Sequence, residues 1–195
     1  MSTKRKPSAR MESATREIVA ATRTWIERAV IGLNLCPFAK PVYEQDRIRY
    51  VVSTARTPEA LFDSLERELR FLAETPAEHT ETTLIIHPWV LGDFLDYNDF
   101  IGVAERGIQA LGLEGVLQVA SFHPDYRFGR TPPDDVTNCT NRSPYPMLHL
   151  LREASIEAAV ASYPDTDRIY RNNIATLRRL GRAGWDALGL KGAKK

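Results

Sequence analysis

A small α/β domain is the fold that the sequence predicts, because three segments typical of strands alternate with two segments typical of helices. The strand-like segments are short and rich in β-branched or aromatic residues, and each intervening helix carries one apolar stripe. This βαβαβ order favours a small, mainly parallel sheet with right-handed crossovers, preceded by one helix and followed by two. A ferredoxin-like α+β sandwich is the alternative.

The first helix is expected over Glu12–Leu33, where apolar residues recur at helical spacing. Gly32 suits its C-terminal end, and Pro37 prevents its continuation. We expect residues 1–11 to form a disordered tail and residues 12–190 to form a single α/β domain.

The strands and helices of the sheet follow in alternation. The expected strands are Ile48–Ala55, Thr82–Val90 and Val116–Phe122. Thr57 and Pro58 supply the N-cap and first position of the first intervening helix, which ends near Pro76. Asp93 or Asp96 begins the second, and Gly112 closes it.

About twenty residues after the third strand, 123–142, show no periodicity. A compact domain seldom keeps so long an irregular loop unless the loop binds something or covers a site. Ser143 and Pro144 are expected to cap and start a helix that Pro164 ends. A last helix is expected over 167–188.

Composition restricts the class of protein. The 195 residues carry a formal net charge of +1, so no charge excess favours nucleic acid or an anionic membrane as partner. No apolar stretch approaches the length of a membrane helix, and the N-terminus lacks a secretory apolar core. The two cysteines make no disulfide framework, which favours a cytoplasmic protein. The oligomeric state stays open.

Two histidines follow the second and third strands, in His87-Pro88 and His123-Pro124. In a parallel sheet the working crevice lies beyond the carboxyl ends of the strands. If these two strands are neighbours, we expect the imidazoles to meet one solute and to serve as acid–base groups.

Cys139 is the candidate nucleophile. It lies four residues before the expected cap Ser143, where a helix N-terminus and Arg142 would both lower the pKa of its thiol. Cys36, just past the first helix, lacks this advantage and is interpreted as a small buried apolar residue. The alternative for Cys139 is a structural role in the loop.

The same expected helix start suits an anion, since free N–H groups and a guanidinium would point at it. Two prolines remove donors there, and Arg142 has Asp134 or Asp135 as an alternative partner. The candidate substrate-binding residues are Asn138, Asn141, Arg142, Asp125 and Arg127.

A metal centre is the competing hypothesis. Imidazole, carboxylate and thiolate suit zinc or iron, although no short ligand motif is present, and the cofactor stays open. The candidate ligands are His87, His123, Asp125, Cys139 and His149.

Four segments resemble a known family. They are LNLCPFAKP (33–41), HPWVLGDFLDYNDF (87–100), VASFHPDYRF (119–128) and DDVTNCTNRSPYPMLHLLRE (134–153). They are similar to a domain-of-unknown-function family, numbered fourteen-fifteen, of bacteria and plants, over roughly residues 16–180. The resemblance implies one cytoplasmic domain and no particular reaction.

These observations lead to one functional hypothesis and two alternatives. We expect an enzyme that acts on a small, anionic metabolite in a cleft at the carboxyl ends of the strands, with His87, His123 and Cys139 as its chemical groups. The alternatives are a zinc or iron protein using the same set, and a non-catalytic module that binds a ligand or another protein. In the last case both imidazoles would simply be packed against backbone carbonyls.

Overall fold

Four strands form one mixed sheet in the computed structural model, which describes residues 9–162, 165–190 and 192. The strands are β1 (Ile48–Val52), β2 (Thr82–Ile86), β3 (Leu117–Phe122) and β4 (Met147–Arg152). Their order across the sheet is β1-β2-β4-β3, with β1 parallel to β2 and β4 antiparallel to both of its neighbours. The predicted α/β class and βαβαβ order are therefore confirmed, and the sheet is mixed rather than mainly parallel because β4 lies between β2 and β3.

Strand β4 replaces the first part of a predicted helix. The prediction that Ser143 and Pro144 start a helix is wrong, because Met147–Arg152 pairs with β2 on one side and β3 on the other. Met147, Leu148 and Leu150 are fully buried, and a short apolar run of this kind suits a central strand as well as a helix. The helix begins only at Glu153, and the predicted helix end at Tyr163-Pro164 lies outside the described residues.

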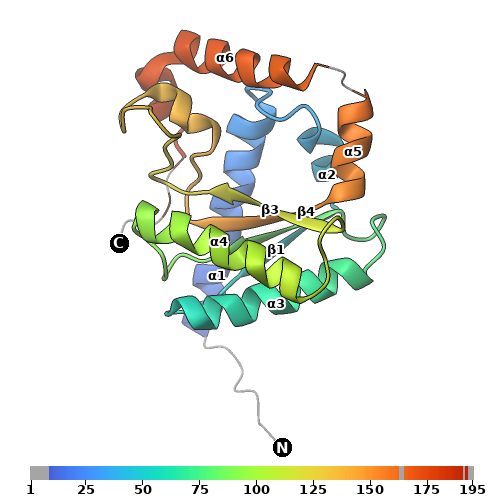
Figure 1. The fold of residues 1–195 in the computed structure, drawn as a ribbon. Coiled ribbons are helices and arrows are strands. Elements are labelled where there is room, and N and C mark those ends of the chain that lie inside the picture. Colours follow the sequence, from blue (N-terminus) through green and yellow to red (C-terminus); the bar gives the residue numbers. More distant parts are fainter. Residues whose placement is uncertain (1–8, 163–164, 191, 193–195) are drawn as a thin grey trace, which may run out of the picture.

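Helices cover both faces of the sheet (Figure 1). In chain order they are α1 (Ala9–Trp25), the π-helix η1 (Ile26–Ile31), α2 (Ala39–Glu44), α3 (Pro58–Glu74), α4 (Phe94–Ala110), the 3₁₀-helix η2 (Val136–Thr140), α5 (Glu153–Ser162) and α6 (Thr166–Ala187). Helices α3 and α4 lie side by side on one face, where the leucines of α3 and Tyr97 of α4 pack on Ile85, Leu148 and Leu150. Helices α1 and α6 pack over the other face, on Leu84, Ile86 and Met147.

Several predicted helix ends are confirmed by cap geometry. The Thr57 hydroxyl accepts the N–H of Ala60, and an Asp93 carboxylate oxygen accepts the N–H groups of Leu95 and Asp96. Gly112 follows α4 with a φ of 68°, a conformation that glycine adopts without strain. Residues 1–8 of the predicted tail lie outside the described residues, and residues 9–11 belong to α1 instead.

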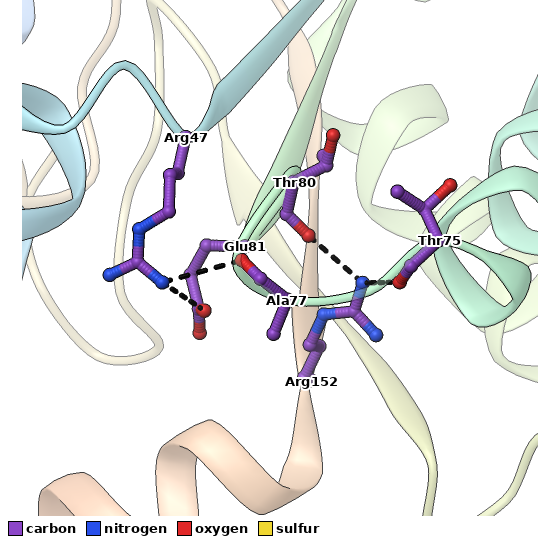
Figure 2. A network of polar contacts seen from close by, with 6 residues as sticks. All are labelled: Arg47, Thr75, Ala77, Thr80, Glu81 and Arg152. Carbon is purple, nitrogen blue, oxygen red and sulfur yellow. Dashed lines mark hydrogen bonds and ion pairs between the residues drawn. The ribbon is translucent and has the colours of Figure 1, made fainter.

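Two arginines hold the turn between α3 and β2 (Figure 2). A guanidinium nitrogen of Arg152, the last residue of β4, donates to the carbonyls of Thr75 and Thr80 at 2.5 and 2.9 Å. Arg47 donates to the Ala77 carbonyl at 3.3 Å and pairs with Glu81 at 3.2 Å. These contacts hold the end of the sheet at which β1 and β2 begin, opposite to the carboxyl ends of β1, β2 and β3.

Replacing Arg152 with methionine is expected to lower the free energy of unfolding by about 2 kcal/mol, because two partly buried carbonyls lose a charged donor while the aliphatic stem is kept. Urea denaturation measures the change. The control is Arg70→Met, which removes an exposed pair with Glu66 and should cost less than about 0.5 kcal/mol. Equal losses in the two variants would show that the turn contacts do not stabilise the fold.

Candidate functional site

The carboxyl ends of β1, β2 and β3 lie at one rim of the sheet. Strand β3 runs in the direction of β2 because both are antiparallel to β4, which lies between them. The condition set for the two imidazoles, that the strands ending at His87 and His123 are neighbours, is therefore not met. The N–H of His87 donates to the Pro146 carbonyl at 3.0 Å, and the N–H of His123 donates to the Asn141 carbonyl at 3.2 Å.

His87 is fully buried at this rim. Its Nδ1–H donates to the Val90 carbonyl at 3.1 Å, which leaves Nε2 as an unprotonated acceptor. Among the described residues no hydrogen-bond partner is found for Nε2. Burial lowers the pKa of His87 to about 4, so the ring is neutral near pH 7.

His123 is also buried and binds the same loop as His87. Its Nδ1 accepts the N–H of Asp125 at 3.0 Å, so Nε2 carries the proton and faces the Leu91 carbonyl at 3.3 Å. Leu91 has a φ of 54°, in the left-handed region. Two imidazoles from separate strand ends thus hold the backbone of residues 88–92 in place.

Tyr97 of α4 joins the two histidines. Its ring centroid lies 5.7 Å from that of His87, in a stacked arrangement, and 5.0 Å from that of His123. Its hydroxyl donates to the Met147 carbonyl at 2.8 Å and accepts the N–H of Phe122 at 2.9 Å. Tyr97 therefore ties the start of β4 and the end of β3 to α4, on the face opposite to α1 and α6.

Loop 88–92 forms one wall of an open cleft beyond the ends of β1 and β2. The cleft has two adjoining cavities of about 480 Å³ each, and Arg56 and Trp89 line both. The first cavity is completed by Arg10, Met11, Ala14 and Thr54. The second is completed by Pro58, Pro88, Val90, Leu91, Gly92 and Asp96.

Arg56 gives the cleft its charge. The guanidinium carbon lies 4.8 Å from the Trp89 ring centroid, a cation–π contact. Within the described part of the chain neither Arg56 nor Arg10 pairs with a carboxylate. Since the indole holds the guanidinium without neutralising it, the positive charge stays available to a ligand.

Two of the side chains predicted to bind substrate, Arg142 and Asn138, hold loop 123–142 together. Arg142 donates to the carbonyls of Tyr126 and Pro133 at 3.1 and 2.5 Å, rather than to Asp134 or Asp135. Asn138 is fully buried. Its side chain bonds the backbone of Phe128 and Pro132 and the Thr131 hydroxyl.

Asn141 likewise donates to the Ser121 carbonyl at 3.1 Å, while Asp125 and Arg127 are exposed. The helix start on which the predicted anion site depended is absent, because β4 begins there. The predicted substrate-binding roles of these side chains therefore have no support from a helix N-terminus.

Cys139 is fully buried in η2, among apolar residues of the α1 and α6 face. Both imidazoles contact Tyr97 on the other face. Burial raises the pKa of the Cys139 thiol, although Arg142 and Arg182 act in the opposite direction. Cys36 is partly buried, burial raises the pKa of its thiol too, and both cysteines are free thiols.

The candidate metal ligands do not gather in one place. Among the residues that the structure describes, no group of three or more His, Cys, Asp or Glu side chains is arranged to hold a metal ion. His149 donates from Nε2 to the Thr82 hydroxyl at 2.7 Å, since that hydroxyl itself donates to the Leu150 carbonyl. Burial lowers the pKa of His149 to about 4.

Comparison with protein families gives one match. The model of the family described as "Protein of unknown function (DUF1415)" matches residues 17–187. The chain belongs to this family. No curated protein and no solved structure gives a match. None of the DUF1415 helices described here has both the length and the apolar character of a membrane span.

Arg56, Trp89 and Tyr97 were missed as site residues in the sequence, although two of them lie in predictable places. Arg56 follows the first expected strand, and Trp89 follows His87-Pro88 at the end of the second. Both side chains of this DUF1415 protein thus follow the carboxyl ends of strands, where ligands bind in sheets of this kind. Tyr97 lies within a helix stripe and gives no separate signal.

Proposed function

We propose that this protein binds a small anionic metabolite in the cleft beyond the carboxyl ends of β1 and β2. The observation that carries the proposal is Arg56, a guanidinium without a carboxylate partner in the described residues, stacked on Trp89 inside the cleft. A carboxylate or phosphate accepts two parallel hydrogen bonds from such a group. Thr54 adds a hydroxyl to the same cavity.

The shape of the cleft supports a small ligand. Each cavity has about 480 Å³, within the range of small-molecule sites, and its wall combines apolar side chains with a few charged or polar groups. Trp89 presents a flat aromatic surface against which a planar group can stack. We also propose a cytoplasmic location, which agrees with the two free thiols.

In this proposal His87 and His123 shape the wall of the cleft. Both rings are buried and their protons face the Val90 and Leu91 carbonyls, so their contacts suit positioning more than proton transfer. Acid–base catalysis by these groups, nucleophilic attack by Cys139 and metal binding stay predictions. If the thiol takes no part in binding, Cys139→Ala should bind anions as the wild type does.

The test is an NMR titration with benzoate, which carries one carboxylate on a flat ring. We expect shifts of the Trp89 indole N–H, assigned with Trp89→Phe, and of the amides of residues 89–92. Arg56→Gln should weaken binding about tenfold, since a charged hydrogen bond is lost.

The matched control is Arg106→Gln, an exposed arginine of α4 that does not line the cleft and carries the same charge. Its affinity for benzoate should equal that of the wild type. Chemical-shift changes spread over the surface, or equal weakening of benzoate binding by both variants, would refute the proposal. Either result would mean that benzoate responds to the net charge of the protein and not to Arg56.

A further inference from the structure

We propose that the ligand of this cleft is bipolar, with an anionic group held by Arg56 and an ammonium group, beyond a planar middle, held by Asp96. This inference rests on the proposed function and adds the chemical class of the ligand. It follows from the unequal charges of the two cavities.

The first cavity is cationic. Its charged residues are Arg10 and Arg56, and Thr54 is its uncharged polar group. The second cavity contains a single acid, Asp96, on a wall otherwise formed by prolines and the apolar loop after β2, apart from Arg56 on the shared side. A ligand that fills both cavities therefore meets positive charge at one end and a carboxylate at the other.

The carboxylate of Asp96 is available for this contact. The neighbouring Asp93 is occupied as the N-cap of α4, where one of its oxygens accepts the N–H groups of Leu95 and Asp96 at 2.8 and 3.3 Å. Asp96 is exposed, and in the described chain no hydrogen bond or ion pair to its carboxylate is found. Asp93 therefore caps the helix, and Asp96 lines the second cavity.

Trp89 determines what lies between the two charged ends. It lines both cavities together with Arg56, so a molecule that spans them passes over the indole. A planar or apolar middle gains contact there, whereas a strongly hydrated middle would lose water without replacing it. The loop that carries Trp89 is held by His87 and His123 through the Val90 and Leu91 carbonyls.

The experiment compares three probes in NMR titrations at one ionic strength: benzoate, 4-(aminomethyl)benzoate and 4-(2-aminoethyl)benzoate. The two aminated probes differ in length and so bracket the separation of the charged groups. We expect at least one of them to bind about two- to fivefold more tightly than benzoate. Asp96→Asn should abolish that gain, whereas Asp99→Asn, at a position of the same helix outside the cleft, should keep it.

The outcomes separate this inference from the proposed function. Benzoate binding at Trp89 without any gain from the ammonium group, or a gain that persists in Asp96→Asn, would overturn the bipolar ligand and leave anion binding intact. Failure of all three probes to shift Trp89 would overturn both.

Discussion

Acidification from about pH 6.5 to about pH 4 is expected to lower the free energy of unfolding by several kcal/mol, through His87 and His149. Burial lowers the pKa of each imidazole to about 4 in the folded protein, and for His87 the nearby His123 adds to the effect. In the unfolded chain both pKa values return to about 6.5. The unfolded state therefore binds more protons between these two pH values.

The direction of the effect follows from this difference. The stability due to the neutral rings is fully present above the unfolded pKa and is lost as the pH falls towards the folded pKa. Each histidine contributes at most roughly 3 kcal/mol over that range. Urea denaturation at a series of pH values measures the slope, which is more informative than the stability of any one variant.

Histidine variants show which imidazole causes the change of the free energy of unfolding with pH. His87→Gln should reduce the pH dependence by about half, whatever its effect on stability at pH 7. His79→Gln, a substitution at an exposed position in the turn before β2, should keep the wild-type slope. A wild-type stability that stays constant down to about pH 4.5 would contradict the burial of neutral histidines.

Replacing Tyr97 with phenylalanine is expected to lower the free energy of unfolding by about 2–3 kcal/mol. The substitution keeps the ring that contacts both histidines and removes only the hydroxyl. Its two partners, the fully buried Met147 carbonyl and the partly buried Phe122 N–H, then each lose a hydrogen bond, which is costly away from water.

Thermal and urea denaturation measure this loss, and Tyr170→Phe is the control because Tyr170 is 58% exposed. The control should change stability by less than about 0.5 kcal/mol. A Tyr97→Phe variant as stable as the wild type would mean that the bridge between α4 and the two strand ends does not stabilise the rim.

Local signals in the sequence were sufficient for most elements of the fold. Thr57-Pro58, Asp93 and Gly112 act within one helical turn, so their roles are readable without tertiary structure. Strand β4 was not predictable in this way. Its apolar run fits either type of element, and only pairing with β2 and β3 on both sides determines that it is extended.

The candidate site was predictable in position but not in composition. Because ligands bind beyond strand carboxyl ends, the sequence predicts a site near His87 and His123, and both residues do lie at that rim. That both rings turn inward to bond the Val90 and Leu91 carbonyls depends on how α4 packs, through Tyr97, and no local pattern encodes it. The two histidines are buried, and Arg56 and Trp89 line the cleft instead.

The position of bound benzoate in a crystal structure of the wild-type protein tests the central claim most directly. The account predicts that the carboxylate contacts the Arg56 guanidinium and that the ring lies against Trp89, within the two cavities beyond β1 and β2. Benzoate bound only elsewhere, with Arg56 still stacked on Trp89 and the cleft filled by solvent, would contradict it.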